Sequence, residues 1–378
     1  MNTPAPSYWE STTLLRPADV AVIGGGLTGL QAALALKRTN PKLDVALLER
    51  APIPRGASTR NAGFACFGGP TELLADLAAY GPESVVATVR ERYAGVQALA
   101  TNFAHRDIDW HRYGGYELID EPATANMVRT KLPELNALLA PITGQPKTWR
   151  IVAESPHLLL HNELEGQLHP GKLVSLLLDD CRRAGVRLLF GCPVETIAEP
   201  VNGTVRVAGA GWGSLTAGRI LLTVNAFASA LLPEDFPEEI RPVRNQVLLS
   251  RPLDRLPVRG CYHYHEGYVY FRNVGEDRLL IGGGRHLAGV QSETDRFGDN
   301  PQVAAYLIGK LNRWFPDRRW RPEDFPQRWS GIIAQGDGKS PVLRLVNERT
   351  LVAGRLAGMG VALSAALAER AARRLYES

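Results

Sequence analysis

The chain has few cysteines, and their spacing does not suit a metal site. Its 378 residues include four, at positions 66, 181, 192 and 261. None belongs to a Cys-x-x-Cys pair, the spacing typical of zinc and redox motifs. We therefore expect thiols that stay reduced, as is usual for cytoplasmic proteins.

Long apolar runs are also absent. No run approaches the roughly 18 residues that a membrane-spanning helix needs, and Asn225 interrupts the apolar segment 221–232. The first seven residues lack the charged region and apolar stretch of a signal peptide. The sequence thus predicts a cytoplasmic protein with no membrane span.

A dense run of positive charge is missing as well. The net charge is +4, and the basic pairs at 182–183 and 318–319 are short and isolated, so we expect no nucleic-acid partner. Hydrophobic residues make up 45% of the chain and charged residues 22%, as in ordinary globular proteins. The length suffices for two domains.

A glycine motif near the N-terminus is the most specific feature that is present. Residues 20–23 form an apolar run typical of a buried parallel strand, Gly24, Gly26 and Gly29 follow, and helical periodicity continues over 30–37. The order strand, Gly-x-Gly-x-x-Gly, helix is that of dinucleotide-binding proteins. It predicts a phosphate site at the N-terminus of the helix.

An acidic residue at the expected distance supports this interpretation. Residues 44–48 read as a second strand, and Glu49 follows it, 49 − 29 = 20 residues past the last glycine. An acid at this point binds a ribose hydroxyl. Glu instead of Arg favours FAD or NAD over NADP.

The rest of the chain alternates between two kinds of pattern. Helix and strand signals near 173–224 and 350–375 resemble the α/β start, whereas 243–250, 262–272 and 279–283 read as antiparallel strands with alternating aromatics. The predicted fold class is α/β with mixed α+β character: a Rossmann-like nucleotide-binding domain interleaved with an antiparallel-sheet domain.

Five motifs in order give the chain a family resemblance. They are residues 22–29 with 48–50, residues 56–63 (Gly-Ala-Ser-Thr-Arg-Asn-Ala-Gly), residues 169–173 with 185–186, residues 329–341, and residues 357–361 (Ala-Gly-Met-Gly-Val). Together they resemble the FAD-dependent D-amino-acid-oxidase superfamily, which includes glycine and sarcosine oxidases. The resemblance is strongest to bacterial members such as γ-glutamylputrescine oxidoreductase.

The resemblance implies a discontinuous FAD-binding domain of residues 1–85, 160–230 and 325–378, and a substrate domain of 86–159 and 231–324. It places residues of four of these five regions against the cofactor, with 60–63 along the reactive edge of the flavin, and it adds Val194 beside the adenine. The implied cofactor-binding residues are Gly24, Gly26, Leu27, Thr28, Gly29, Glu49, Arg50, Ser58, Thr59, Arg60, Asn61, Ala62, Gly63, Val194, Asn225, Gly331, Gly358, Met359, Gly360 and Val361.

The chain also departs from the family pattern. Members that oxidise α-amino acids carry an Arg near the fourth motif, but residues 331–335 contain none, which favours an amine. Members that attach FAD covalently use a Cys near the same element, and no Cys follows Cys261, so we expect non-covalent FAD. Phe227 stands where the family has a smaller residue.

Candidate substrate contacts lie on the antiparallel strands. Alternation along 262–272 would place Tyr268, Tyr270 and Arg272 on one face, either as a substrate wall or as a solvated outer surface. Arg244 and Gln246 on the neighbouring strand are candidates for substrate contacts or for a structural ion pair. The pair formed by His263 and His265 lacks a third ligand, and we expect no metal.

The predicted function is oxidation of a C–N bond in an amine or amino acid, with hydride transfer to FAD and hydrolysis of the resulting imine. The partner is then a small-molecule substrate. Two alternatives remain: a flavin-dependent monooxygenase and a non-catalytic FAD-binding protein. The sequence does not predict the oligomeric state.

Overall fold

The computed structural model describes residues 5–377, which divide into two compact units. The first contains the chain up to Thr59, Gly171–Pro242, and the chain from Ile333 onward; the second contains Arg60–Pro170 and Val243–Ile332. The predicted domains divide the chain differently from these units: residues 60–85, 160–170 and 325–332 of the predicted FAD-binding domain lie in the second unit, and residues 231–242 of the predicted substrate domain lie in the first. The reason is that the helix starting at Pro70 and the strand before Pro170 pack and pair within that unit.

A largely parallel sheet forms the centre of the first unit, in the order β17-β18-β11-β1-β2-β8. The strands β1, β2, β11 and β18 are almost wholly buried where they pair, which explains their continuous apolar sequences. Two short strands, β9 and β10, extend β11 in antiparallel fashion. The bounds are β1 (Ala18–Ile23), β2 (Val45–Glu49), β8 (Arg187–Phe190), β9 (Thr196–Ile197), β10 (Val205–Gly209), β11 (Gly213–Leu222), β17 (Val342–Asn347) and β18 (Thr350–Gly354).

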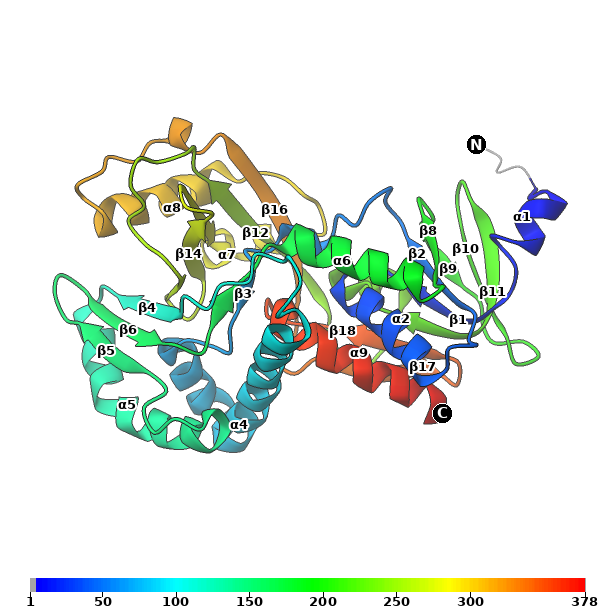
Figure 1. The fold of residues 1–378 in the computed structure, drawn as a ribbon, viewed down its shortest axis with the longest axis horizontal. Coiled ribbons are helices and arrows are strands. Elements are labelled where there is room, and N and C mark those ends of the chain that lie inside the picture. The colour runs from blue at the N-terminus through cyan, green and yellow to red at the C-terminus, as the bar shows by residue number, and fades with distance from the viewer. Residues whose placement is uncertain (1–4, 378) are drawn as a thin grey trace. The chain divides into compact units, whose positions relative to one another are not determined.

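The first and last long helices of this unit pack against each other, although more than 300 residues separate them in the chain. Figure 1 shows α2 and α9 side by side, and Gln31 Nε2 on α2 donates to Ser364 Oγ on α9 at 2.8 Å. The helical bounds are α1 (Tyr8–Thr12), α2 (Leu27–Thr39), α3 (Ala57–Arg60), α6 (Pro170–Arg183), α9 (Gly360–Glu377) and the 3₁₀ segment η1 (Asn225–Leu231).

The second unit is built on a mainly antiparallel sheet, in the order β16-β12-β15-β14-β13-β4-β6-β5. A separate two-stranded sheet joins β3 to β7. The bounds are β3 (Phe64–Ala65), β4 (Gly115–Ile119), β5 (Arg150–Ala153), β6 (Leu158–Asn162), β7 (Gly166–Gln167), β12 (Arg241–Leu249), β13 (Cys261–Tyr264), β14 (Val269–Val274), β15 (Arg278–Gly283) and β16 (Gln327–Gln335).

Helices of the second unit supply two further cores. One packs α8 against β13, β14 and β15, and the other packs α4 against α5 and β6. Gly81, with φ of 77°, breaks α4 into two helical pieces, and Pro82 begins the second. The helical bounds are α4 (Pro70–Asn102), α5 (Pro122–Thr143), α7 (Arg285–Ala288), η2 (Gly289–Ser292), α8 (Pro301–Trp314) and η3 (Pro322–Asp324).

The expectation of one strand over 262–272 is wrong. The segment is a hairpin of β13 and β14, joined by a turn at 265–268 in which His265, Glu266 and Gly267 all have positive φ. His265 therefore lies in the turn instead of sharing a strand face with His263. The alternation that we expected along β14 is present: Val269 and Phe271 enter one core, whereas Tyr270 enters another.

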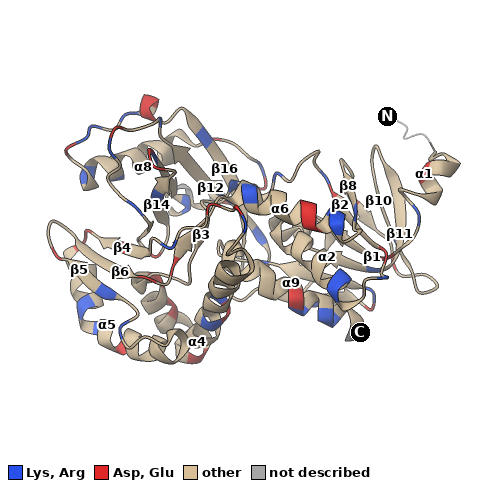
Figure 2. Ribbon diagram, in the orientation of Figure 1, with Lys and Arg blue, Asp and Glu red and all other residues tan. Residues whose placement is uncertain are grey.

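Two features of the described residues concern surfaces. No helix among them is long and apolar enough to cross a membrane. Figure 2 shows Lys and Arg interspersed with Asp and Glu over both units, without a long stripe of one sign in the described part of the chain.

Candidate functional site

The glycine turn of the first unit is packed so tightly that side chains do not fit. Gly24 has φ of +110°, and a Cβ on Gly29 would lie 2.0 Å from the Gly24 carbonyl oxygen. Thr223, at the end of β11, fastens the turn by donating from Oγ1 to the carbonyls of Ile23 and Gly24. The turn thus brings the start of α2 directly onto the sheet.

Glu49 reaches this turn from the end of β2. One carboxylate oxygen accepts the Gly25 N–H at 2.9 Å, and the other accepts the Ala51 N–H at 3.0 Å. Ser58 lies on the other side, where its Oγ accepts the Leu27 N–H at 2.8 Å. An acid and a hydroxyl therefore meet at the N-terminus of α2, next to Gly26 and Thr28.

Arg50 and Phe227 form a stacked pair in the first unit. The guanidinium carbon of Arg50 lies 3.8 Å from the centre of the Phe227 ring, a favourable cation–π geometry. Asn225 lies on the same short segment, η1, and its Oδ1 accepts the Leu356 N–H at 3.4 Å. The Phe227 ring therefore covers the Arg50 guanidinium. Val194, the residue predicted beside the adenine, lies half-buried in the connection between β8 and β9.

The C-terminal turn precedes α9 in the same unit. Gly358 has φ of 85°, the Met359 N–H donates to Leu356, and the helix begins at Gly360, followed by Val361. Arg355 holds the turn through an ion pair of 3.1 Å with Glu238 and bonds to the carbonyls of Glu239 and Ser340. Because the first N–H groups of a long helix attract negative charge, this turn suits an anionic ring edge.

In the second unit, residues 60–63 form a loop that the surrounding elements hold from several sides. Arg60 donates to the Ser330 carbonyl at 3.0 Å, and Trp329 Nε1 donates to the Arg60 carbonyl at 3.0 Å. Asn61 Oδ1 accepts the Gly63 N–H at 2.7 Å. Gly331 lies beside Arg60, where an added Cβ would be 3.5 Å from its carbonyl oxygen.

Arg272 supports this loop, and its role as a substrate contact stays a prediction. It is buried, and its guanidinium donates to the backbone carbonyls of Ala62, Leu168 and Asn273. Burial lowers its pKa to about 10, so the group stays charged at neutral pH. The side chain fixes the loop in place.

Tyr270 and Tyr268 lie near the same loop. Tyr270 packs in a cluster with Ala62, Phe64 and Trp329, and burial raises the pKa of its hydroxyl to about 12. Tyr270 is therefore partly covered by this cluster. Tyr268 lies at the end of the hairpin turn and not in the strand.

Gln246 is occupied by structural contacts. Its Nε2 donates to Asp299 at 2.9 Å, and its Oε1 accepts the Asn300 N–H at 3.0 Å, which together hold the segment leading into α8. Arg244, in the same strand, makes a long bond of 3.4 Å to the Arg296 carbonyl. Neither forms an ion pair with the residues that the structure describes, and the Gln246 amide keeps a second N–H that these contacts do not use.

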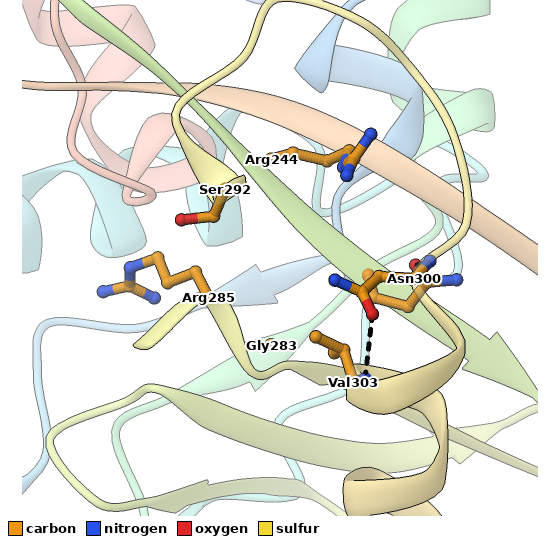
Figure 3. Close-up of a pocket in the computed structure, with 7 residues that line it drawn as sticks. Arg244, Gly283, Arg285, Ser292, Asn300 and Val303 are labelled. Carbon is orange, nitrogen blue, oxygen red and sulfur yellow. Dashed lines mark hydrogen bonds between the residues drawn. The ribbon is translucent and has the colours of Figure 1, made fainter. Parts of the chain in front are cut away.

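Arg244 and Gln246 both line a small cavity in the second unit, which the sequence did not predict. Its other lining residues are Gly283, Arg285, Ser292, Asn300 and Val303, and Figure 3 shows Arg244 and Arg285 extending from different sides of it. Arg285 follows three consecutive glycines, which were the only signal in the sequence that this position is unusual.

A buried polar cluster also lies in this unit. His263 Nε2 and Glu165 Oε2 are 3.0 Å apart, and ligand atoms of Cys66, Glu165 and His263 all lie within 4.8 Å of one another. Burial raises the pKa of the Cys66 thiol well above its usual value, which opposes metal binding because a metal needs the thiolate. Glu117 lies nearby, and burial raises its pKa to about 7.

The glycine turn, Glu49 and the parallel sheet define a dinucleotide-binding protein, and the added antiparallel sheet is that of a two-unit flavoprotein. The chain belongs to the family of FAD-dependent oxidoreductases, whose model matches residues 19–374. The resemblance read from the five motifs is thereby confirmed.

Similar proteins span nearly the whole chain. The probable oxidoreductase OrdL of Rhizobium meliloti (strain 1021) is 26% identical over 393 residues, which cover 96% of this chain and 86% of OrdL. The γ-glutamylputrescine oxidoreductase of Escherichia coli (strain K12) is 25% identical over 334 residues, which cover 83% of this chain and 73% of that enzyme. The fold is also that of the L-α-glycerophosphate oxidase of Mycoplasma pneumoniae, solved with FAD bound, with a TM-score of 0.75, 16% identity and coverage of 96% and 95%.

The cofactor of this protein is FAD, as in the rest of its family. The first unit fits that cofactor on its own geometry: a turn with no room for a Cβ, a helix N-terminus, and a carboxylate fixed at the turn. The pyrophosphate would be held at Gly24–Gly29 with Ser58, and the ribose by Glu49.

Proposed function

We propose that this FAD-dependent oxidoreductase oxidises a C–N bond in an amine or amino acid. The observation that carries the proposal is the loop at 60–63, which is held from several sides and packed with Tyr270 against the antiparallel sheet. A rigid loop of this kind suits the positioning of a small substrate beside a flavin. The name of the Escherichia coli relative supports an amine.

The residues present match the demands of this chemistry. FAD, when bound, supplies the acceptor for the hydride that leaves the carbon next to nitrogen. A nitrogen proton passes to solvent, a C=N bond forms, and water then hydrolyses it to a carbonyl compound and a free amine. This sequence of steps needs no triad or carboxylate pair, provided the amine binds in its neutral form.

Tyr270 is the clearest candidate for a polar contact with the substrate. Because its pKa is about 12, the hydroxyl keeps its proton at neutral pH and can donate or accept a hydrogen bond. Trp329 and Phe64 in the same cluster would exclude water from that contact. We also keep Tyr268, Arg244 and Gln246 as candidates, and Arg272 ranks last among the predicted contacts because its guanidinium donates to three backbone carbonyls.

Anaerobic reduction of the purified holoenzyme tests the proposal. A panel of primary amines, N-methyl amino acids and D- and L-amino acids would be mixed with the protein under nitrogen, and loss of flavin absorbance recorded. We expect members of this panel to bleach the flavin. Rapid oxidation of NADPH, or a flavin that no amine or amino acid reduces, would contradict the proposal and favour the monooxygenase or the non-catalytic alternative.

The fold it shares with glycerophosphate oxidase points to a second candidate, oxidation of a C–O bond. Adding L-α-glycerophosphate to the same panel separates the two. Reoxidation of the bleached enzyme by oxygen or by a quinone then distinguishes an oxidase from a dehydrogenase. The four cysteines, none of which forms a disulfide, support the cytoplasmic location that we propose.

A further inference from the structure

Phe227 makes a close contact with Arg50 that the proposed function does not use. The guanidinium carbon of Arg50 lies 3.8 Å from the centre of the Phe227 ring. The other pairs of an arginine and an aromatic ring among the described residues are 4.3–5.6 Å apart. The guanidinium of Arg50 is therefore seated directly on the face of the ring, where the attraction between a cation and an aromatic face is favourable.

The ring is the whole set of partners that the Arg50 side chain has within residues 5–377. The side chain forms neither a hydrogen bond nor an ion pair there. The adjacent acid, Glu49, directs its two carboxylate oxygens to the N–H groups of Gly25 and Ala51. Stacking uses the face of a guanidinium and leaves the N–H donors in its plane available. The pair thus presents a positive charge that no neighbouring carboxylate neutralises.

The topology of the sheet places this pair across the glycine turn. β1 lies between β2 and β11. Arg50 follows β2 directly, and Phe227 belongs to η1, which follows β11. Neighbouring parallel strands end at the same edge and lie about 4.8 Å apart, so β2 and β11 are separated by the width of β1. A contact between Arg50 and Phe227 therefore spans the carboxyl end of β1, where the glycine turn begins.

The same two strands also grip the turn itself. At the end of β2, Glu49 accepts the Gly25 N–H at 2.9 Å. At the end of β11, Thr223 donates to the Gly24 carbonyl at 3.1 Å. The contact between the ring and the guanidinium completes a closed circuit of contacts around the turn. This is the edge of the sheet at which the diphosphate of a dinucleotide lies.

The sheet fixes the backbone that carries Phe227. Asn225, at the start of η1, has φ of 49°, a conformation uncommon outside glycine. Its Oδ1 accepts the Leu356 N–H at 3.4 Å, and a Cβ on Gly354 would lie 3.3 Å from the Asn225 Cα. The Phe227 N–H in turn donates to the Val224 carbonyl at 3.0 Å. The ring is thus presented to Arg50 by a segment that is held against the end of β18.

A guanidinium at this edge suits the diphosphate of FAD. The diphosphate is the negatively charged part of that cofactor, and arginine binds phosphate oxygens with two parallel hydrogen bonds. The first N–H groups of α2 supply only partial positive charge to the same group. Arg50 adds a full positive charge, and the Phe227 ring reduces the side-chain freedom that Arg50 would lose on binding.

We propose that Phe227 and Arg50 form a clasp that retains FAD: Arg50 binds the diphosphate, and Phe227 holds the guanidinium across the end of β1. Phe227 acts through Arg50 and is a positioning residue for the cofactor. The inference concerns retention of FAD and not the substrate. It therefore stands or falls independently of C–N oxidation.

Release of FAD from the holoenzyme tests the clasp. The holoenzyme is diluted, and the rise in flavin fluorescence gives the rate of release. Arg50→Met should release FAD about tenfold faster than wild type, and Phe227→Leu about fivefold faster. Phe227→Tyr keeps an aromatic face and should stay close to wild type. The control Arg318→Met removes a guanidinium that lies 4.7 Å from the Trp320 ring in the second unit, and it should leave release unchanged.

The double variant separates positioning from a structural role. If Phe227 acts through Arg50, the variant with both Arg50→Met and Phe227→Leu should release FAD no faster than Arg50→Met alone. Effects that multiply in the double variant would mean that Phe227 supports the fold independently of Arg50, and they would overturn the proposal. Release at the wild-type rate from both single variants would overturn it as well.

Ionic strength identifies the part of FAD that Arg50 binds. Salt screens the attraction between exposed charges, so added NaCl should speed release from wild type and from Arg50→Lys more than release from Arg50→Met. An equal response of all three would contradict binding to the diphosphate and would indicate stacking on the uncharged adenine. Flavin that stays attached to the fully unfolded chain would also overturn the proposal, because a covalently linked cofactor needs no clasp.

Discussion

Replacing Gly29 by Ala should disable the glycine turn. A Cβ at this position would lie 2.0 Å from the Gly24 carbonyl oxygen and 2.6 Å from Thr223 Oγ1. Ordinary carbon contacts are about 3.5 Å or longer, so the start of α2 must move away from the turn by about 1 Å or more. Overpacking of this kind costs about 1–3 kcal/mol, occasionally more, and the backbone contact places this case at about 3 kcal/mol.

The cost can appear in either of two measurements. If the turn keeps its shape, the free energy of unfolding of the apoprotein falls by about 3 kcal/mol. If the turn relaxes around the new methyl group, the loss appears instead in the free energy of FAD binding. The dissociation constant of FAD then rises about 100-fold, because 1.4 kcal/mol is a factor of ten. Urea unfolding of the apoprotein and quenching of FAD fluorescence on binding measure the two losses, and their sum should be about 3 kcal/mol.

Gly338→Ala is the matched control. Gly338 also lies in a loop of the first unit, but nothing is within 4 Å of an added Cβ and its φ is not in the left-handed region. We expect both quantities to stay at wild-type values. The reasoning would be refuted if Gly29→Ala bound FAD within threefold of wild type and unfolded within about 0.5 kcal/mol of it.

Further predictions concern Glu49, Glu117, Arg272 and the flavin linkage. Glu49→Ala leaves the N–H groups of two residues without their acceptor, so FAD should bind at least tenfold more weakly in equilibrium dialysis. Because the pKa of Glu117 is raised from 4.5 to about 7, the folded state binds this proton more tightly than the unfolded chain does. The free energy of unfolding should then fall as pH rises from 4.5 to 7, by up to about 3 kcal/mol, and urea unfolding of Glu117→Gln should show a flatter dependence. Arg272→Met removes three hydrogen bonds and should lower the free energy of unfolding by about 2–4 kcal/mol. Acid precipitation should release yellow FAD into the supernatant, and colour retained in the pellet would contradict non-covalent binding.

The nucleotide-binding half was readable from the sequence because its determinants are local. The strand β1, the turn and α2 follow one another directly, so apolar periodicity and three glycines suffice to predict them. Glu49 could be predicted because it lies at a fixed distance along the chain from the last glycine of the turn. None of these signals depends on contacts with distant parts of the chain.

The hairpin at 261–274 was misread because its turn carries weak signals. His265 and Glu266 both adopt positive φ, a conformation uncommon outside glycine, and Gly267 alone did not indicate a break in an aromatic-rich run. A turn formed mainly by residues of low turn propensity is stabilised by its tertiary surroundings. Here Glu266 N–H donates to Thr71 Oγ1 at 3.0 Å, a contact across 195 residues.

The roles of individual arginines could not be predicted from the sequence either. Arg272 was predicted on a substrate wall or a solvated surface, and in the structure its partners are backbone carbonyls up to 210 residues away. Arg285 drew no attention, although its buried Nε has no hydrogen-bond partner among the described residues. Pattern shows that an arginine lies on a strand or after a glycine turn, whereas its function depends on which acceptors surround it.

The pairing of α2 with α9 has a consequence for synthesis of the chain. The glycine turn leaves the ribosome long before β17, β18 and α9, which complete its sheet and cover its helix. The apolar faces of β11 and α2 therefore stay uncovered on the nascent chain until these late elements emerge. A chain cut before Thr350 would lack β18 and α9, and its glycine turn would stand on an incomplete sheet.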